Sequence, residues 1–179
     1  YPNFNDGHAI AYDRYRQVLV YHRQGNTWEY DATNGWDQKS PENQPGGSRE
    51  YHSMAYDPIT QKVLLFGGTD GGSNDCNSSE TGNSCDDTWT WDGTDWEKIT
   101  TSTAPAPRRY HQMVLDETLG QVVLFGGSSE NADSYSSWDN TYYNDTWTWN
   151  GSNWVKLDDG SNKPRGRSDF AMAYHPSSG

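Results

Sequence analysis

The stretch Asp87-Thr88-Trp89-Thr90-Trp91-Asp92-Gly93 recurs almost letter for letter as Asp145-Thr146-Trp147-Thr148-Trp149-Asn150-Gly151, and this recurrence decides the fold. A further tryptophan follows each copy, at Trp96 and at Trp154. A weaker copy lies upstream as Asn26-Thr27-Trp28-Glu29-Tyr30-Asp31, followed by Trp36. Eight of the nine tryptophans belong to these copies, which indicates an architecture built from internal repeats.

Each copy has the pattern of a β-strand that ends in a turn. Trp89 and Trp91 alternate with threonines, so the two tryptophans share one face of the strand. The Asp92-Gly93 pair that follows is a strong signal for a tight hairpin, as are Asn150-Gly151 and Asn34-Gly35.

Four strand-like runs make up each complete repeat. In the second repeat they are His52 to Asp57, Lys62 to Phe66, Asp87 to Trp91 and Asp95 to Ile99. The second run is continuously apolar, which predicts a strand buried on both faces. It ends at Gly67-Gly68, where a side chain would block the close packing of a neighbour. Since one such sheet cannot cover both of its own faces, the sheets are expected to stack radially as the blades of a propeller.

The repeats place three blades at about 8–40, 52–100 and 111–158, with the start of a fourth at about 170–179. The first repeat lacks the Gly-Gly pair, and the terminal unit of an array is often atypical. Because propellers typically have four to eight blades, the remaining blades are expected from a longer chain or from other protomers. A longer chain is favoured, and an open stack is the other alternative.

In full, the repeat runs Pro-x-Pro-Arg, His-x-Met, Val-Leu-Phe-Gly-Gly and Asp-Thr-Trp-x-Trp, as between Pro105 and Trp149. This pattern resembles the kelch repeat, and it is most similar to the repeats of secreted proteins related to the central domain of galactose oxidase. The resemblance covers nearly the whole chain. It implies an all-β, kelch-type β-propeller of three four-stranded blades plus the first strand of a fourth, but it implies no particular activity.

Composition excludes several partners. The formal net charge of −12 repels phosphate backbones and anionic membrane surfaces, so nucleic acid and lipid are poor partners. No apolar run approaches the length that membrane insertion requires. Aromatic residues, at 14% of the chain, can supply the core that a low aliphatic content would not.

The two cysteines indicate the compartment. Cys76 and Cys85 lie close together in one polar loop, and a local disulfide is favoured over two free thiols. A disulfide implies an oxidising, extracellular location. No signal peptide is visible at Tyr1, which fits a processed secreted protein or a cytoplasmic one. The N-glycosylation pattern is matched at Asn77, Asn144 and Asn150.

The long links of a four-stranded meander gather at one end. These are the links between strands two and three, at 69–86 and 128–144, and the Pro-rich links between blades, at 40–51, 101–110 and 158–169. Long loops on one end of a rigid scaffold are where binding usually resides. A ligand is therefore expected at this end.

Trp138 is the one tryptophan that the repeat does not require. It lies in the long link of the third repeat, near Tyr135, Tyr142 and Tyr143. Clustered aromatic residues among polar ones suit the apolar face of a sugar or a protein partner. The alternative, slightly favoured, is that Trp138 folds back as a plug over the end of its blade.

Arginines recur just before each repeat, at Arg49, Arg108 and Arg167. A guanidinium fork there could bind a carboxylate or sulfate of a ligand. It could equally pair with an aspartate of the adjacent blade, such as Asp87 or Asp145. The structural role is favoured because the arginines recur in step with the scaffold.

Metal and cofactor sites are weakly indicated. His8, His52 and His111 could ring an axis and ligate a metal, but the fourth repeat has Phe170 at this position, which favours aromatic packing. The acidic loop from 70 to 87 suits calcium chemically, although no EF-hand spacing is present. We therefore expect no cofactor, with calcium as an alternative.

Two functional classes remain, and a non-catalytic role is favoured. The first is an extracellular binding or adhesion module that recognises a glycan or a protein. The second is a fragment of a copper radical oxidase like those that the repeat resembles. Such enzymes need a cysteine cross-linked to tyrosine, and here both cysteines lie in one loop, so copper is not expected. No catalytic motif is present. A structural unit of an extracellular assembly is a further alternative.

Overall fold

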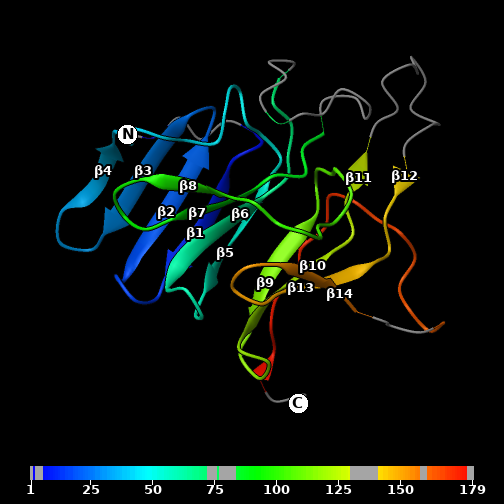
Figure 1. Ribbon diagram of the computed structural model, residues 1–179. Helices are drawn as coiled ribbons and strands as arrows, with labels where there is room; N and C mark the ends of the chain where they lie inside the picture. The colour runs from blue at the N-terminus through cyan, green and yellow to red at the C-terminus, as the bar shows by residue number, and fades with distance from the viewer. Residues whose placement is uncertain are drawn as a thin grey trace.

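The computed structural model describes residues 2, 6–71, 76, 84–129, 141–157 and 161–176. Within these residues it contains three four-stranded antiparallel sheets and a short ribbon (Figure 1). Blade 1 comprises β1 (Ala9–Asp13), β2 (Val18–Arg23), β3 (Asn26–Asp31) and β4 (Gly35–Lys39). Blade 2 comprises β5 (Ser53–Asp57), β6 (Lys62–Phe66), β7 (Thr88–Trp91) and β8 (Trp96–Ile99). Blade 3 comprises β9 (Gln112–Asp116), β10 (Gln121–Phe125), β13 (Thr146–Trp149) and β14 (Trp154–Lys156), while β11 (Ser128–Ser129) and β12 (Thr141–Tyr142) form the ribbon.

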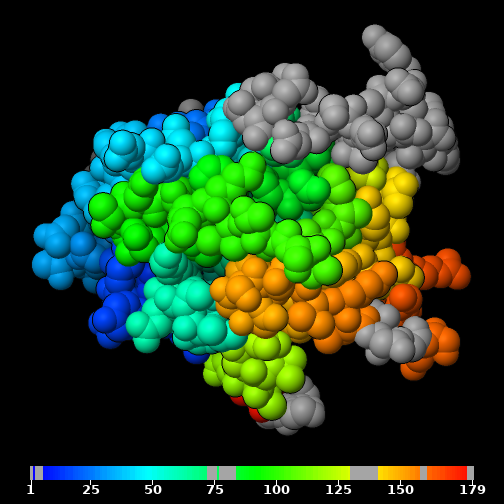
Figure 2. Space-filling model, in the orientation of Figure 1, coloured from blue at the N-terminus to red at the C-terminus, as the bar shows by residue number. Residues whose placement is uncertain are grey.

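Each blade is a simple meander, as the repeat predicts. In blade 2 the order is β5-β6-β7-β8, with Leu65 opposite Trp89 and Trp91 opposite Trp96. The first strands of the blades lie innermost, and β5 contacts both β1 and β9. In the space-filling view, the outer strands of blade 2 (green) lie between blade 1 (blue to cyan) and the outer strands of blade 3 (orange) (Figure 2). The predicted all-β, radially stacked architecture is therefore confirmed.

The hydrophobic core lies between blades rather than within them. Val63 and Leu65 of β6 face blade 1 and pack with Trp91 and Trp96 of their own blade. The other face of the same strand packs against Trp149 and Trp154 of blade 3. All of β6 from residue 63 to residue 66 is fully buried, as the continuous apolar run predicts.

Tryptophan N–H groups join neighbouring blades. Trp96 donates from Nε1 to Thr27 Oγ1 of blade 1 at 2.9 Å, and Trp154 donates to Thr88 Oγ1 of blade 2 at 3.0 Å. The other tryptophan of each pair binds an acid of the preceding blade, since Trp91 donates to Glu29 at 2.8 Å. The apolar area of each indole is thus buried while its one polar atom has a partner.

The Gly-Gly pair that follows β6 allows the link between blades 2 and 3 to pack closely against it. Gly67 has a φ of +64°, and a Cβ there would lie 2.6 Å from the carbonyl oxygen of Arg108 and 2.9 Å from His111. Because real Cβ atoms do not approach other atoms so closely, only glycine fits. The prediction that a neighbour packs closely at this pair agrees with the structure.

The outer hairpins are longer than a two-residue turn. The β7–β8 link spans residues 92–95, and Asp92 Oδ1 accepts the backbone N–H groups of Thr94 and Asp95. Gly93 has a φ of +102°, as the Asp-Gly signal requires. The side chain of Asp92 therefore organises a wider turn than the dipeptide alone predicts.

Residues 161–176 contain no strand, although a first strand of a fourth blade was expected from Phe170. The segment still follows the path of an inner strand beside β9 (red in Figure 1). The backbone N–H of Asp169 donates to the carbonyl of Tyr110, as Tyr110 donates to Tyr51. A strand is defined by a hydrogen-bonded neighbour, and no described residue supplies one at this edge.

Candidate functional site

The described parts of the long links gather at one end of the blades, as the meander predicts, and we call this the loop end. There, Glu50 of the link between blades 1 and 2 bridges to Thr69, which in turn bridges to Ser84. Arg109, in the next link, bridges to Ser128. Isolated backbone bridges therefore hold the links to one another, in addition to any side-chain contacts.

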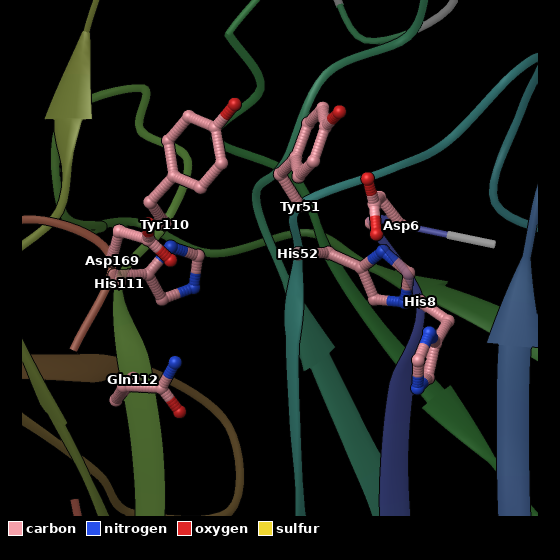
Figure 3. A pocket seen from close by; sticks show the side chains of 9 residues that line it. Asp6, His8, Tyr51, His52, Tyr110, His111, Gln112 and Asp169 are labelled. Carbon is pink, nitrogen blue, oxygen red and sulfur yellow. The ribbon is translucent and has the colours of Figure 1, made fainter. Parts of the chain in front are cut away.

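A cavity of about 550 Å³ opens at the loop end, between the inner strands, and we call it the axial pocket. Residues from all three blades line it, because each inner strand begins there. Figure 3 shows the imidazoles of His8, His52 and His111 along its wall and the rings of Tyr51 and Tyr110 standing side by side above them. The full lining is Asp6, Gly7, His8, Tyr51, His52, Tyr110, His111, Gln112 and Asp169.

The residue two positions before each inner strand, and Asp169 at the equivalent place in the repeat, has a left-handed backbone. The φ values are +58° at Tyr51, +55° at Tyr110 and +55° at Asp169, while Gly7 stands at this place in blade 1. A positive φ is uncommon for a bulky residue and costs of order 1–3 kcal/mol. The strain is stabilised by a backbone chain, in which Tyr51 N–H donates to Gly7 C=O at 2.8 Å and Tyr110 N–H to Tyr51 C=O at 3.0 Å.

This conformation brings the two tyrosine rings together. The ring centroids of Tyr51 and Tyr110 are 4.5 Å apart. Burial raises the pKa of Tyr110, so its hydroxyl remains protonated at neutral pH. The pair forms an aromatic wall with two hydroxyl groups at the mouth of the axial pocket.

The repeated histidines pack as aromatic rings, as predicted from Phe170. His111 meets Phe66 edge-on at a centroid distance of 5.6 Å, and His52 meets His22 edge-on at 5.4 Å. Phe170 meets Phe125 in the same way at 5.9 Å.

The buried imidazoles are uncharged at neutral pH. Burial, and then the charge of Arg108, lowers the pKa of His111 to about 3. Burial and the charge of Arg49 lower that of His22 to about 3 as well. For His52, burial and neighbouring imidazoles hold the pKa well below its usual value. Both ring nitrogens of His52 are buried and hydrogen-bond to none of the described residues.

Two of the three repeated arginines form buried ion pairs. Arg49 donates from Nη1 and Nη2 to the carboxylate of Asp87 at 2.5 and 2.9 Å, and from Nη1 to the carbonyl of Gly67. Arg108 makes the same contacts with Asp145. The partner aspartates belong to the blade that follows each arginine, so the arginine joins a link to its own repeat rather than to an adjacent blade. Arg167 is exposed.

Comparison with known proteins agrees with this geometry. Residues 7–178 match the family model described as KLHDC2/KLHL20/DRC7 Kelch-repeats domain. This chain belongs to the kelch-repeat family. No curated protein matches the kelch chain.

A solved structure described as "Structure of YjhT" superimposes on the kelch chain with a TM-score of 0.68 and 14% sequence identity. The match covers 93% of this chain and 54% of that one. The kelch chain therefore spans about half the length of that structure. At this identity the likeness shows the fold alone.

The aromatic residues predicted around Trp138 are only partly placed. Trp138 and Tyr135 lie outside the described residues, so their ligand role and the plug alternative both remain predictions. Tyr143 packs its ring on the guanidinium of Arg108 at 4.1 Å and donates its hydroxyl to Ser129 at 3.0 Å, which fixes it within the kelch scaffold. Tyr142 is exposed on β12 at the loop end.

The disulfide between Cys76 and Cys85 is present, as predicted. With both cysteines joined to each other, neither can form the tyrosine cross-link of a copper radical site, so the described residues do not fit that group. No set of three metal-ligating side chains gathers within the described residues. Most of the acidic loop lies outside them, so calcium there stays untested.

Two other sequence predictions concern the surface. Of the three glycosylation patterns, Asn144 is half-buried, Asn150 is exposed and Asn77 lies outside the described residues. Within the part of the chain that the structure describes, no helix is long and apolar enough to cross a membrane.

Sequence reasoning missed the axial pocket itself. The histidines were identified as packing residues, but the tyrosines before them were not singled out. Their recurrence as Tyr51 and Tyr110 directly before His52 and His111 was the available signal. No local pattern marks a left-handed tyrosine, because its conformation is imposed by the backbone chain between blades.

Proposed function

We propose that this kelch chain is a non-catalytic, extracellular binding module whose ligand, a protein or a glycan, docks on the loop end over the axial pocket. The axial pocket carries the proposal, because it joins a concave surface, an aromatic wall and buried polar atoms at the end where the links gather. Concave sites with a few convergent polar groups are the usual form of ligand sites.

The chemistry of the pocket favours a neutral hydrogen-bonding group on the ligand. The imidazole of His52 is uncharged, and its nitrogens can accept from and donate to a hydroxyl or an amide. The tyrosine pair offers a flat apolar surface to a sugar face or a peptide plane. Sugar hydroxyls and peptide amides both meet these requirements. The disulfide is compatible with the extracellular location.

The test uses two substitutions that separate packing from binding. His52→Phe places at this position the residue that the fourth repeat has naturally, so the edge-on packing is retained while the ring nitrogens are lost. Tyr110→Ala removes half of the aromatic wall. Tyr15→Ala, in the exposed β1–β2 turn at the opposite end, is the matched control.

The wild-type chain is first screened against arrays of soluble glycans and a displayed peptide library. For a ligand found in this way, His52→Phe is expected to weaken binding about tenfold or more, the loss that accompanies a missing buried hydrogen bond. Tyr15→Ala is expected to bind as the wild type does. Equal binding by all three variants would show that the ligand does not use the axial pocket, and a wild type that binds neither library would remove the proposal.

A further inference from the structure

The axial pocket combines carboxylates with an aromatic wall. Asp6 and Asp169 supply the carboxylates, and both residues are exposed. Among the described residues that line the pocket, no lysine or arginine is present to neutralise them. Figure 3 shows the two aspartates on opposite sides of the axial pocket, with the rings of Tyr51 and Tyr110 between them. The pocket therefore presents negative charge on both sides of its aromatic wall.

The scaffold fixes the position of both aspartates. Asp169 stands at the place of Tyr51 and Tyr110 in the repeat, and its backbone N–H donates to the carbonyl of Tyr110 at 3.1 Å. Asp6 directly precedes Gly7, whose carbonyl accepts the N–H of Tyr51 at 2.8 Å. The two aspartates thus mark the ends of the backbone chain that connects the blades at the pocket.

The nearby cations leave this negative charge in place. Arg23 donates to the backbone carbonyl of Asp6, but its guanidinium also forms an ion pair with Glu50. Arg109 lies over the ring of Tyr110, with 5.1 Å between the guanidinium carbon and the ring centre. One arginine against two carboxylates leaves an excess of negative charge, and the net charge of −12 adds a field of the same sign. This environment attracts a cation.

The wall of the axial pocket offers uncharged hydrogen-bonding groups. His52 is 5% exposed, and both of its ring nitrogens lack a hydrogen-bond partner among the described residues. The amide of Gln112 lines the pocket as well. A neutral imidazole donates from one nitrogen and accepts at the other, and an amide also does both. Because a hydroxyl group can pair with either, the ligand is expected to combine hydroxyl groups with a cation.

The backbone at the axial pocket favours a sugar over an extended peptide. A peptide that binds in an extended form needs free backbone groups with which to pair. The N–H groups of Tyr51, Tyr110 and Asp169 are all used within the molecule. The ring faces of the tyrosine pair, by contrast, suit the flat apolar face of a sugar ring.

We propose that the axial pocket selects an amino sugar whose amine is free and protonated, as in the glucosamine units of a deacetylated polysaccharide. The amine donates to the carboxylates of Asp6 and Asp169, which gives charge-assisted hydrogen bonds. The sugar ring packs on the tyrosine pair, and a hydroxyl group binds His52. This inference rests on the proposed function, because it names the ligand class of the same site.

Short oligomers of glucosamine and the fully acetylated oligomers of the same length are the probes. They share the sugar ring and its hydroxyl groups, and they differ in whether the nitrogen carries a charge. Titration calorimetry at about pH 6, where a free amine is protonated, gives both affinities at one ionic strength. The wild-type chain is expected to bind the free amine at least about tenfold more tightly than the acetylated one.

Three substitutions locate the charge that is recognised. Asp6→Asn and Asp169→Asn keep the size of each side chain and are each expected to weaken binding of the glucosamine oligomer about threefold. The double variant is expected to lose most of the preference for the free amine. Glu117→Gln, in the exposed β9–β10 turn at the opposite end, removes the same charge and is expected to bind as the wild type does.

Three outcomes would overturn this inference. The first is equal binding of the free and the acetylated oligomers by the wild-type chain. The second is a loss of binding by Glu117→Gln that matches the loss by Asp169→Asn, which would assign the attraction to net charge alone. The third is tighter binding of a lysine-containing peptide than of the glucosamine oligomer, which would make the ligand a protein.

The failure of this inference can be told apart from the failure of the proposed function. If the acetylated oligomer or a library ligand binds and His52→Phe weakens that binding, the axial pocket is a ligand site that does not select an amine. If the wild-type chain binds neither oligomer and no library ligand, both proposals are removed.

Discussion

Replacing Arg108 by methionine should destabilise the protein far more than the same change at Arg167, although both occupy the same place in the repeat. The guanidinium of Arg108 is fully buried and binds the carboxylate of Asp145 through two nitrogens, at 2.7 and 3.0 Å. It also donates to the carbonyls of Ala106 and Gly126, each at 2.9 Å. Arg167 is exposed, and among the described residues its side chain donates to the carbonyl of Arg165 alone.

The magnitude follows from what the substitution leaves behind. Methionine keeps most of the aliphatic volume, so the main cost is a partly buried carboxylate without its partner. Removing one member of a buried ion pair costs about 3–5 kcal/mol. The Asp145 side chain is 15% exposed, so we expect the lower end, about 3 kcal/mol. At about 2–4 °C per kcal/mol for a chain of this size, the melting temperature should fall by about 6–12 °C.

The pH dependence gives a second readout. Burial alone raises the pKa of Asp145, but the hydrogen bonds and charge of Arg108 outweigh it, so the folded pKa lies below the usual value. A lowered folded pKa stabilises the protein above the unfolded pKa of the carboxyl, near 4, and this stabilisation disappears as the pH falls through the folded pKa. In Arg108→Met the remaining effect of burial should raise the pKa of Asp145 above its usual value. This carboxyl should then destabilise the folded protein above about pH 4, whereas in the wild type it stabilises it.

Calorimetry and denaturant unfolding of Arg108→Met, Arg167→Met and Arg108→Met/Asp145→Asn test this reasoning. The double variant should recover part of the loss, because a neutral amide is less costly than an unpaired carboxylate. Arg167→Met should stay within about 0.5 kcal/mol of the wild type, as an exposed site does. Similar losses for the two single variants would refute the assignment of the buried ion pair as the origin of the effect.

Three other predictions concern the core and the loop end. Because the pKa values of His22 and His111 are about 3 in the folded state, the unfolded chain binds more protons than the folded chain between pH 6.5 and 3. The free energy of unfolding should therefore fall by about 2 kcal/mol for each histidine between pH 8 and 5. In melts recorded across this range, the stability of His111→Phe should depend less on pH than that of the wild type. Gly67→Ala should cost about 2–3 kcal/mol in denaturant melts, because its Cβ would lie 2.6 Å from the Arg108 carbonyl, whereas Gly120→Ala, with a similar φ and open space, should cost about 1 kcal/mol. Reduction of the disulfide should remove a restraint worth roughly 2–3 kcal/mol in the chain-entropy model and yet leave the blades folded. Far-ultraviolet circular dichroism of the reduced protein checks this expectation. Loss of the β-sheet signal on reduction would contradict the prediction that the blades stay folded.

The strands and their faces could be predicted because their signals are local. Alternation in Thr88-Trp89-Thr90-Trp91 assigns the faces, and the apolar run of β6 indicates burial on both sides. The Cys76–Cys85 disulfide follows from proximity in sequence in the same way. Each of these features depends on residues within one blade, where the period of the strand determines the neighbours.

The contacts between blades could not be predicted in detail. Nothing in the sequence near Trp149 indicates that its indole binds Asp57, 92 residues away. The arginines were predicted to pair with an aspartate such as Asp87 or Asp145, and both pairs are present, but each joins a link to the blade that it introduces instead of joining two blades. The left-handed backbone at Tyr51 is likewise a product of packing between blades.

The direction of the indole hydrogen bonds gives the stack a polarity. In both interfaces the donor lies on the later blade and the acceptor on the earlier one, as with Trp96 and Thr27. One side of the stack therefore presents acceptors, and two copies of that side cannot satisfy each other across a two-fold axis. Association through these sides must be heterologous, so it either closes into a ring or continues as a helical filament, depending on the rotation from one blade to the next.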